Sequence, residues 1–77
     1  MKKGTFEYYT LDLGVKGPGI ATTPLYFAFT AEYDERTDKC ELTSHVEVFD
    51  EDTNDWHRVP VVIANVVEST LHKDLFV

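Results

Sequence analysis

Apolar and polar residues alternate over long stretches of this chain, which is the pattern of a β-strand with one buried face. The alternation is clearest over residues 25–33, and similar patterns predict strands at about 5–15, 40–49 and 56–59. In the strand at 25–33, the core face is expected to carry the odd-numbered residues Leu25, Phe27, Phe29, Ala31 and Tyr33.

The first and third predicted strands have less regular patterns. In the first, Tyr9 and Leu11 share one face, and Phe6 lies with Tyr8 on the other unless a β-bulge shifts the phase. In the third, the inner face is expected to hold Cys40, Leu42, Ser44, Val46 and Val48. Its outer face is expected to hold Glu41, Thr43, His45, Glu47 and Phe49.

Two acidic segments, 34–39 and 50–55, begin with the shared pattern Asp-Glu-x-Thr-(Asp or Asn). In each, the leading aspartate is placed to accept hydrogen bonds from amides of a turn. The fifth residue, Asp38 or Asn54, falls where a hairpin loop requires a positive φ, which Asp and Asn tolerate better than most residues. Both segments therefore predict hairpin loops, which join the strands around them into a meander.

The carboxy-terminal part of the chain changes period. From residue 61 to about 73, apolar residues recur at spacings of three and four, which is typical of a helix with one buried side. Pro60 suits the start of a helix, although the valines and the isoleucine that follow favour a strand by propensity. We expect a helix, and we expect the apolar tail at 75–77 either to pack or to mark a contact.

The predicted fold is α+β: one domain over residues 1–77, with a four-stranded antiparallel β-meander and one C-terminal helix packed on one face. Residues 16–24, which contain Gly-Pro-Gly, predict a loop longer than a hairpin turn. One helix covers only part of such a sheet, so the other face is left uncovered. That face is expected to carry Tyr8, Tyr26, Ala28, Thr30, Thr43, His45 and Phe49.

Aromatic residues on a nominally solvated face have two interpretations. Aromatic cross-strand pairs stiffen a sheet, and scattered surface aromatics are common. Extended apolar patches also mark binding or dimerisation faces, in which aromatic residues are enriched. The residues expected to bind a partner on this second interpretation are Tyr8, Tyr26, His45, Phe49 and Trp56.

The charge is negative and uneven, with a formal net charge of −7 over 77 residues. The acidic surface is expected to consist mainly of Asp34, Glu35, Asp38, Glu41, Glu47, Asp50, Glu51, Asp52 and Asp55. Such a surface disfavours direct contact with nucleic acid or an anionic membrane, because both require a basic footprint. It serves either recognition or only solubility and protection of strand edges. With no apolar run of spanning length and a single cysteine, a cytoplasmic location is expected.

No motif predicts catalysis, a cofactor or a metal. The segment from Asp50 has calcium-type spacing at first but lacks the glycine and the closing glutamate of such a loop. The three histidines lack the spacing of a helical zinc motif. Cys40 lies on a predicted core face, where a free cysteine most often behaves as a small hydrophobe. We therefore expect a protein that is not an enzyme.

Two functions remain. The first is a small acidic protein-binding module that pairs with itself, as a homodimer, or with another protein through the aromatic sheet face. The alternative is an acidic inhibitor that imitates nucleic acid, of the kind that accessory proteins of mobile elements can be, and blocks a basic surface of its target. The salt dependence of binding separates the two, because exposed charges are screened within about 10 Å at 0.1 M salt.

Overall fold

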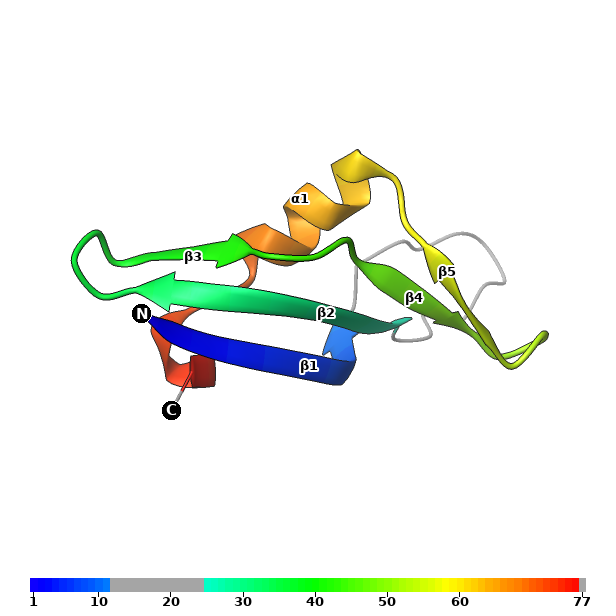
Figure 1. Cartoon of the computed structure of the whole chain (residues 1–77). Coiled ribbons are helices and arrows are strands. Elements are labelled where there is room, and N and C mark those ends of the chain that lie inside the picture. Colours follow the sequence, from blue (N-terminus) through cyan, green and yellow to red (C-terminus); the bar gives the residue numbers. More distant parts are fainter. Residues whose placement is uncertain (12–24, 77) are drawn as a thin grey trace.

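The strands form one antiparallel sheet with a helical segment on one side of it, in a computed structural model that describes residues 1–11 and 25–76 (Figure 1). The elements are β1 (Lys2–Leu11), β2 (Leu25–Asp34), β3 (Lys39–Leu42), β4 (Glu47–Asp50), β5 (Asp55–Arg58), α1 (Val61–Ser69) and the 3₁₀-helix η1 (Lys73–Phe76). Within the described residues the strand order is β1-β2-β4-β5, and β3 pairs with β2 beside β4. The predicted α+β meander with one C-terminal helix is confirmed. The predicted loop at 16–24 and the end of the first predicted strand lie outside the described residues.

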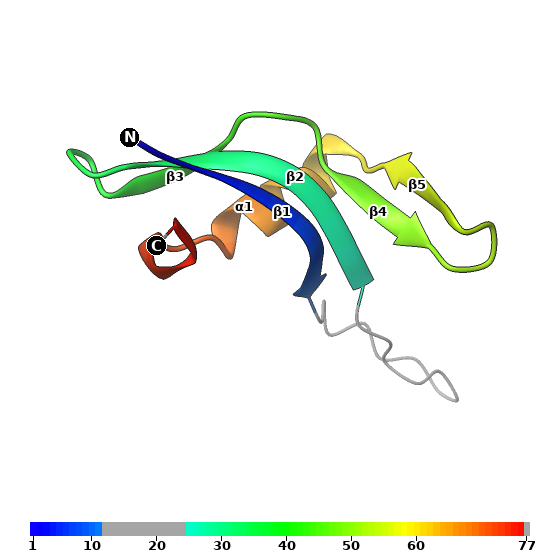
Figure 2. The same ribbon diagram turned by 60° about the horizontal axis from the view of Figure 1, so that its bottom comes forward.

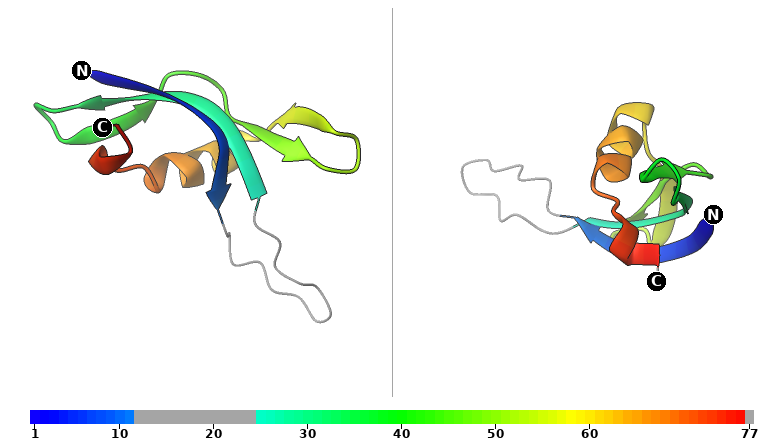
Figure 3. Two further views of the ribbon diagram at one scale, coloured as in Figure 1. Left: turned by 90° about the horizontal axis from the view of Figure 1, so that it is seen from below. Right: turned by 90° about the vertical axis from the view of Figure 1, so that its left-hand side faces the viewer.

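The core lies between the sheet and the helical segment. Strand β2 carries the predicted alternation, and four of its inward residues are buried. On the same side, Val67 of α1 is fully buried, and Phe76 of η1 packs against the rings of Phe6 and Tyr33. The strands β1 and β2 curve around α1 and η1 (Figures 2 and 3). The buried core residues are Phe27, Phe29, Ala31, Tyr33, Val46, Val67 and Phe76.

A β-bulge interrupts β1. Phe6 pairs with Phe29 and Tyr9 pairs with Phe27, so three steps along β1 match two steps along β2. The extra residue turns both Phe6 and Tyr9 toward the core and leaves Tyr8, with a φ of 56°, on the other face. The bulge that the sequence left open is therefore present.

The predicted third strand, 40–49, is two strands, and here the sequence prediction is wrong. Between the pairs Ala31–Leu42 and Ala28–Glu47, β2 has two residues whereas the facing segment has four. In the interruption, the amide of Thr30 donates to the hydroxyl oxygen of Ser44 (2.9 Å), which stands in for a backbone carbonyl. Ser44 is consequently exposed and not an inner-face residue.

The helix ends at Ser69 and not at 73. The hydroxyls of Ser69 and Thr70 donate to the carbonyls of Val66 and Val67, at 2.6 and 2.7 Å. Such local side-chain bonds compete with the helical ladder, and the amide of Thr70 bonds to the carbonyl three residues back in the tighter 3₁₀ pattern. The apolar tail packs through Phe76, which is 5 % exposed.

Candidate protein-binding face

Four aromatic residues meet on the side of the sheet away from α1. Tyr8 is at the centre: its ring centroid lies 6.1 Å from that of Tyr26, 6.0 Å from Phe49 and 5.4 Å from Trp56. Phe49 and Trp56 are in turn 5.2 Å apart. We call Tyr8, Tyr26, Phe49 and Trp56 the aromatic cluster. All these separations are within the range in which aromatic pairs attract one another.

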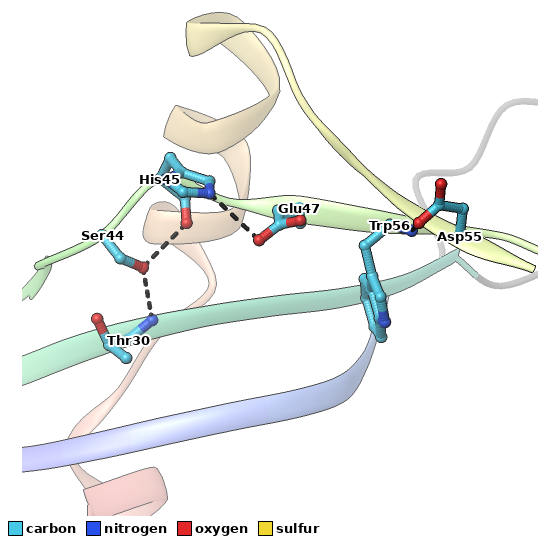
Figure 4. A network of polar contacts seen from close by, with 6 residues as sticks. All are labelled: Thr30, Ser44, His45, Glu47, Asp55 and Trp56. Carbon is cyan, nitrogen blue, oxygen red and sulfur yellow. Dashed lines mark hydrogen bonds and ion pairs between the residues drawn. The ribbon is translucent and has the colours of Figure 1, made fainter.

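Each ring of the aromatic cluster comes from a different strand. The bulge in β1 aims Tyr8 outward, and Tyr26 follows from the alternation of β2, in which its neighbour Phe27 points to the core. Phe49 and Trp56 are direct partners in the ladder between β4 and β5. Figure 4 shows Trp56 reaching from β5 across the end of β2. A surface patch is thus assembled from four separate parts of the sheet.

The aromatic cluster is only partly shielded from solvent. Tyr8, its central residue, is 55 % exposed, whereas the other three are half-buried. A large aromatic residue that is more than half exposed and also held at positive φ is unusual, because a side chain in that conformation costs about 1–2 kcal/mol. The sheet therefore holds this ring in place against a local conformational preference.

A groove of about 390 Å³ adjoins the aromatic cluster. The ladder between β2 and β4 stops at the pair Phe27–Val48, and beyond this point the two strands diverge, as Figure 2 shows. The residues that line the groove are Leu25, Tyr26, Val48, Phe49, Asp50, Glu51, Asp52 and His57. Leu25, which the alternation placed on the core face, is 39 % exposed and forms part of this lining.

The two acidic hairpin loops lie at opposite ends of the sheet, with the β4–β5 loop at the groove (Figure 1). Asp34 accepts a hydrogen bond from the amide of Arg36, and Asp50 accepts one from the amide of Asp52, both at 2.9 Å. Asp38 and Asn54 have φ values of 56° and 57°. The predicted loop chemistry is confirmed, so the first aspartate of each loop has a structural role in its turn.

Between these ends, the outer face is polar. Glu32 lies directly opposite Glu41 on one side and opposite Lys3 on the other. Thr30 and Thr43 are joined through their hydroxyls at 2.8 Å. The hydroxyl pair thus separates Glu32 and Glu41 from the aromatic cluster, whereas Glu47, opposite Ala28, lies on the cluster's side of this pair.

His45, predicted to act with the aromatic residues, lies apart from the aromatic cluster. It is in the interruption between β3 and β4, where its Nε2 is 3.2 Å from Glu47 Oε1 and its carbonyl accepts the Ser44 hydroxyl (Figure 4). His57, which the sequence analysis left out of the site, lines the groove 3.6 Å from Asp50. In the hairpin that the loop at 50–55 predicts, His57 pairs with Val48, and this register was the signal that could have placed His57 beside β4.

Two groups at the other end of the sheet have altered acidity. The Tyr33 hydroxyl donates to Asp38 Oδ1 at 2.5 Å, and this hydrogen bond, with burial and the charge of Asp38, raises the pKa of Tyr33 to about 12. Burial, and then the charge of Asp38, raises the pKa of Cys40. A thiol with a raised pKa stays protonated at neutral pH and is a poor nucleophile.

The comparisons with known proteins assign the chain to no group: no protein-family model, no curated protein and no solved structure matches it. Over residues 1–11 and 25–76, no group of three or more His, Cys, Asp or Glu side chains is arranged to hold a metal ion. Nor does this part of the chain contain a helix of the length and apolar character needed to cross a bilayer.

Proposed function

We propose that this protein is a non-catalytic binding module that docks another protein chain on the aromatic cluster. The observation that carries the proposal is the convergence of four aromatic rings from four strands on the face that α1 does not cover. Tyrosine and tryptophan are enriched where proteins bind one another, because they supply large contact areas at low cost in side-chain entropy.

The conformation of Tyr8 supports the same proposal. Backbone strain persists only where the surrounding structure over-determines it, and bulges beside functional sites serve to re-aim a side chain. Here the bulge re-aims Tyr8 from the core side to the centre of the aromatic cluster. A sheet that needed only stiffness would gain the cross-strand pair of Phe49 and Trp56 without this strained residue.

The test replaces two rings of the aromatic cluster by small polar residues. We expect Tyr26→Ser combined with Phe49→Ser to abolish retention of partner proteins from an extract of the source organism. Both rings belong to the aromatic cluster and contact its central residue, Tyr8. Retention is measured on the immobilised protein, with circular dichroism to verify that the fold is kept.

A matched control exists on the helix. Val61 and Val62 are the most exposed aliphatic side chains of α1, at 77 % and 65 %, and they lie away from the aromatic cluster. Val61→Ser with Val62→Ser removes a similar amount of exposed apolar surface and should leave association unchanged. Association that survives the aromatic substitutions, or that is lost with the valine substitutions instead, contradicts the proposal.

The acidic inhibitor that imitates nucleic acid is the second candidate, and one observation favours it. Glu32 and Glu41 lie side by side across the β2–β3 ladder, an arrangement of like charges that costs stability. On this alternative, Glu32→Gln with Glu41→Gln should weaken binding to the target and the aromatic substitutions should not. The affinity should also fall steeply with salt. Binding that responds neither to the glutamine substitutions nor to salt excludes this candidate.

A further inference from the structure

The groove beside the aromatic cluster combines two kinds of wall. The aromatic residues Tyr26 and Phe49 form one part of its lining. The β4–β5 loop, with Asp50, Glu51 and Asp52, forms another. The faces of aromatic rings carry partial negative charge, so both kinds of wall attract a cation.

Within residues 1–11 and 25–76, no hydrogen bond or ion pair engages the side-chain carboxylates of Glu51 and Asp52. Asp50 is engaged with the amide of Asp52 through Oδ1 and lies 3.6 Å from His57 Nε2 through Oδ2. The side chains of Glu51 and Asp52 are exposed at the tip of the same loop. Two carboxylates therefore belong to residues that line the same groove as Tyr26 and Phe49.

The basic residues of the hairpin do not neutralise this charge. Arg58 lies opposite Glu47 in the β4–β5 ladder, toward the other end of the hairpin from the loop. Of the carboxylates that line the groove, only that of Asp50 contacts His57. The charge of the groove lining is consequently negative.

Charge also argues against a second copy of this chain as the occupant. The chain carries a formal net charge of −7, and docking two aromatic clusters face to face would bring two sets of these carboxylates together. Like charges at an interface oppose association. The complementary occupant is positively charged.

Resting on the proposed function, we infer that the groove receives an arginine side chain from an extended segment of the partner protein. Guanidinium is planar, stacks on aromatic faces and binds carboxylates through paired hydrogen bonds, so it satisfies both walls at once. The divergence of β2 and β4 beyond Phe27–Val48 gives an extended segment access to this part of the sheet.

The experiment titrates the full protein, labelled with ¹⁵N, with three acetylated pentapeptide amides: Ala-Arg-Leu-Arg-Ala and its lysine and citrulline counterparts. Citrulline keeps the planar shape of arginine but is uncharged. We expect the amide signals of Phe49, Asp52 and His57 to shift with the arginine peptide, less with lysine and least with citrulline. Raising the salt to about 0.5 M, which shortens the Debye length to about 4 Å, should weaken binding.

Charge variants separate this inference from the proposed function. Glu51→Gln with Asp52→Asn should raise the Kd of the arginine peptide by about five- to tenfold, as expected for two exposed charge pairs. The control, Glu35→Gln with Asp74→Asn, removes two exposed charges away from the groove and should change the Kd by less than about twofold.

The outcomes are distinct. Equal binding of the arginine and citrulline peptides, or no shift with any peptide, overturns the arginine inference. If Phe49→Ser abolishes partner retention while the charge variant does not, the aromatic cluster binds a partner without an arginine and the proposed function stands. If neither substitution affects retention, both proposals fail.

Discussion

At the scale of single residues, Tyr8 connects the backbone to the candidate site. Its φ of 56° is the conformation that glycine adopts freely and that a residue with a Cβ adopts at a cost. Tyr8→Gly and Tyr8→Ala both remove the ring, but only the alanine keeps the conformational penalty. We expect the glycine variant to be more stable by roughly 1 kcal/mol in urea unfolding.

Thr10 provides the control for that comparison, because it lies in the same strand in regular pairing with Tyr26. There the usual order should hold, with alanine more stable than glycine. If alanine is also the more stable replacement at Tyr8, the bulge is not present in solution, and the position of the central ring must be revised.

The hydrogen bond from Tyr33 to Asp38 makes a prediction about pH. The pKa of Tyr33 is raised to about 12 in the folded protein, mainly by this bond, from 10.0 for an ordinary tyrosine. The stabilisation is therefore fully present below about pH 10 and is lost as the pH rises toward 12. Urea midpoints measured over this range should fall less steeply for Tyr33→Phe than for the wild type. Parallel curves for the two proteins would show that the bond is absent.

At the scale of elements, the ladder between β2 and β3 contains an unfavourable pair. Glu32 and Glu41 lie directly opposite one another, and replacing one by lysine converts repulsion to attraction. We expect Glu41→Lys to stabilise the protein by about 0.5 kcal/mol at low salt, with Glu41→Gln in between. A gain that does not shrink on adding salt would mean that charge is not its cause.

The helix α1 packs on the sheet through one side of its surface. Val67 is fully buried against the sheet, whereas Val62 is 65 % exposed. Val67→Ala should cost about 2 kcal/mol of unfolding free energy, from lost burial and the cavity left behind. Val62→Ala should change it by less than about 0.5 kcal/mol. Equal effects in thermal unfolding would contradict the packing of α1 described above.

Burial of one face of a strand or helix imposes a regular spacing on its apolar residues, and this spacing predicted most of the elements. The alternation of β2 and the positive φ of Asp38 and Asn54 follow from local rules, and both are confirmed. The break before β4 was missed because its two extra residues preserve the alternation. Val46, which lies in the break, is therefore still buried as the pattern predicted. The early end of α1 depends on hydroxyl bonds from Ser69 and Thr70 that an apolar pattern does not reveal.

The candidate site was predictable in part for the same reason. Alternation placed Tyr26 and Phe49 on the outer face, and the structure brings both into contact with Tyr8. His45 was grouped with them from its register alone, but the interruption of the strand separates it from the rings. The groove arises where β2 and β4 diverge, a property of strand pairing that the sequence of either strand does not contain.

At the scale of the whole molecule, the two faces of the sheet have different roles in this account. One face packs on α1 and η1 and supplies the core (Figure 3). The other presents the aromatic cluster at one end and acidic, hydroxyl-rich positions at the other. A protein of this size buries a modest fraction of its surface on folding, so the binding of a partner would add to its stability.

The central claim, that a protein partner sits on the aromatic cluster, is tested most directly by photo-crosslinking in living cells. A benzoylphenylalanine is placed at Tyr26 and, in a separate protein, at Val62 on the exposed side of α1. We expect a discrete adduct with another protein chain from position 26 on irradiation, and none from position 62. An adduct from position 62 alone, or no adduct from position 26, would contradict it.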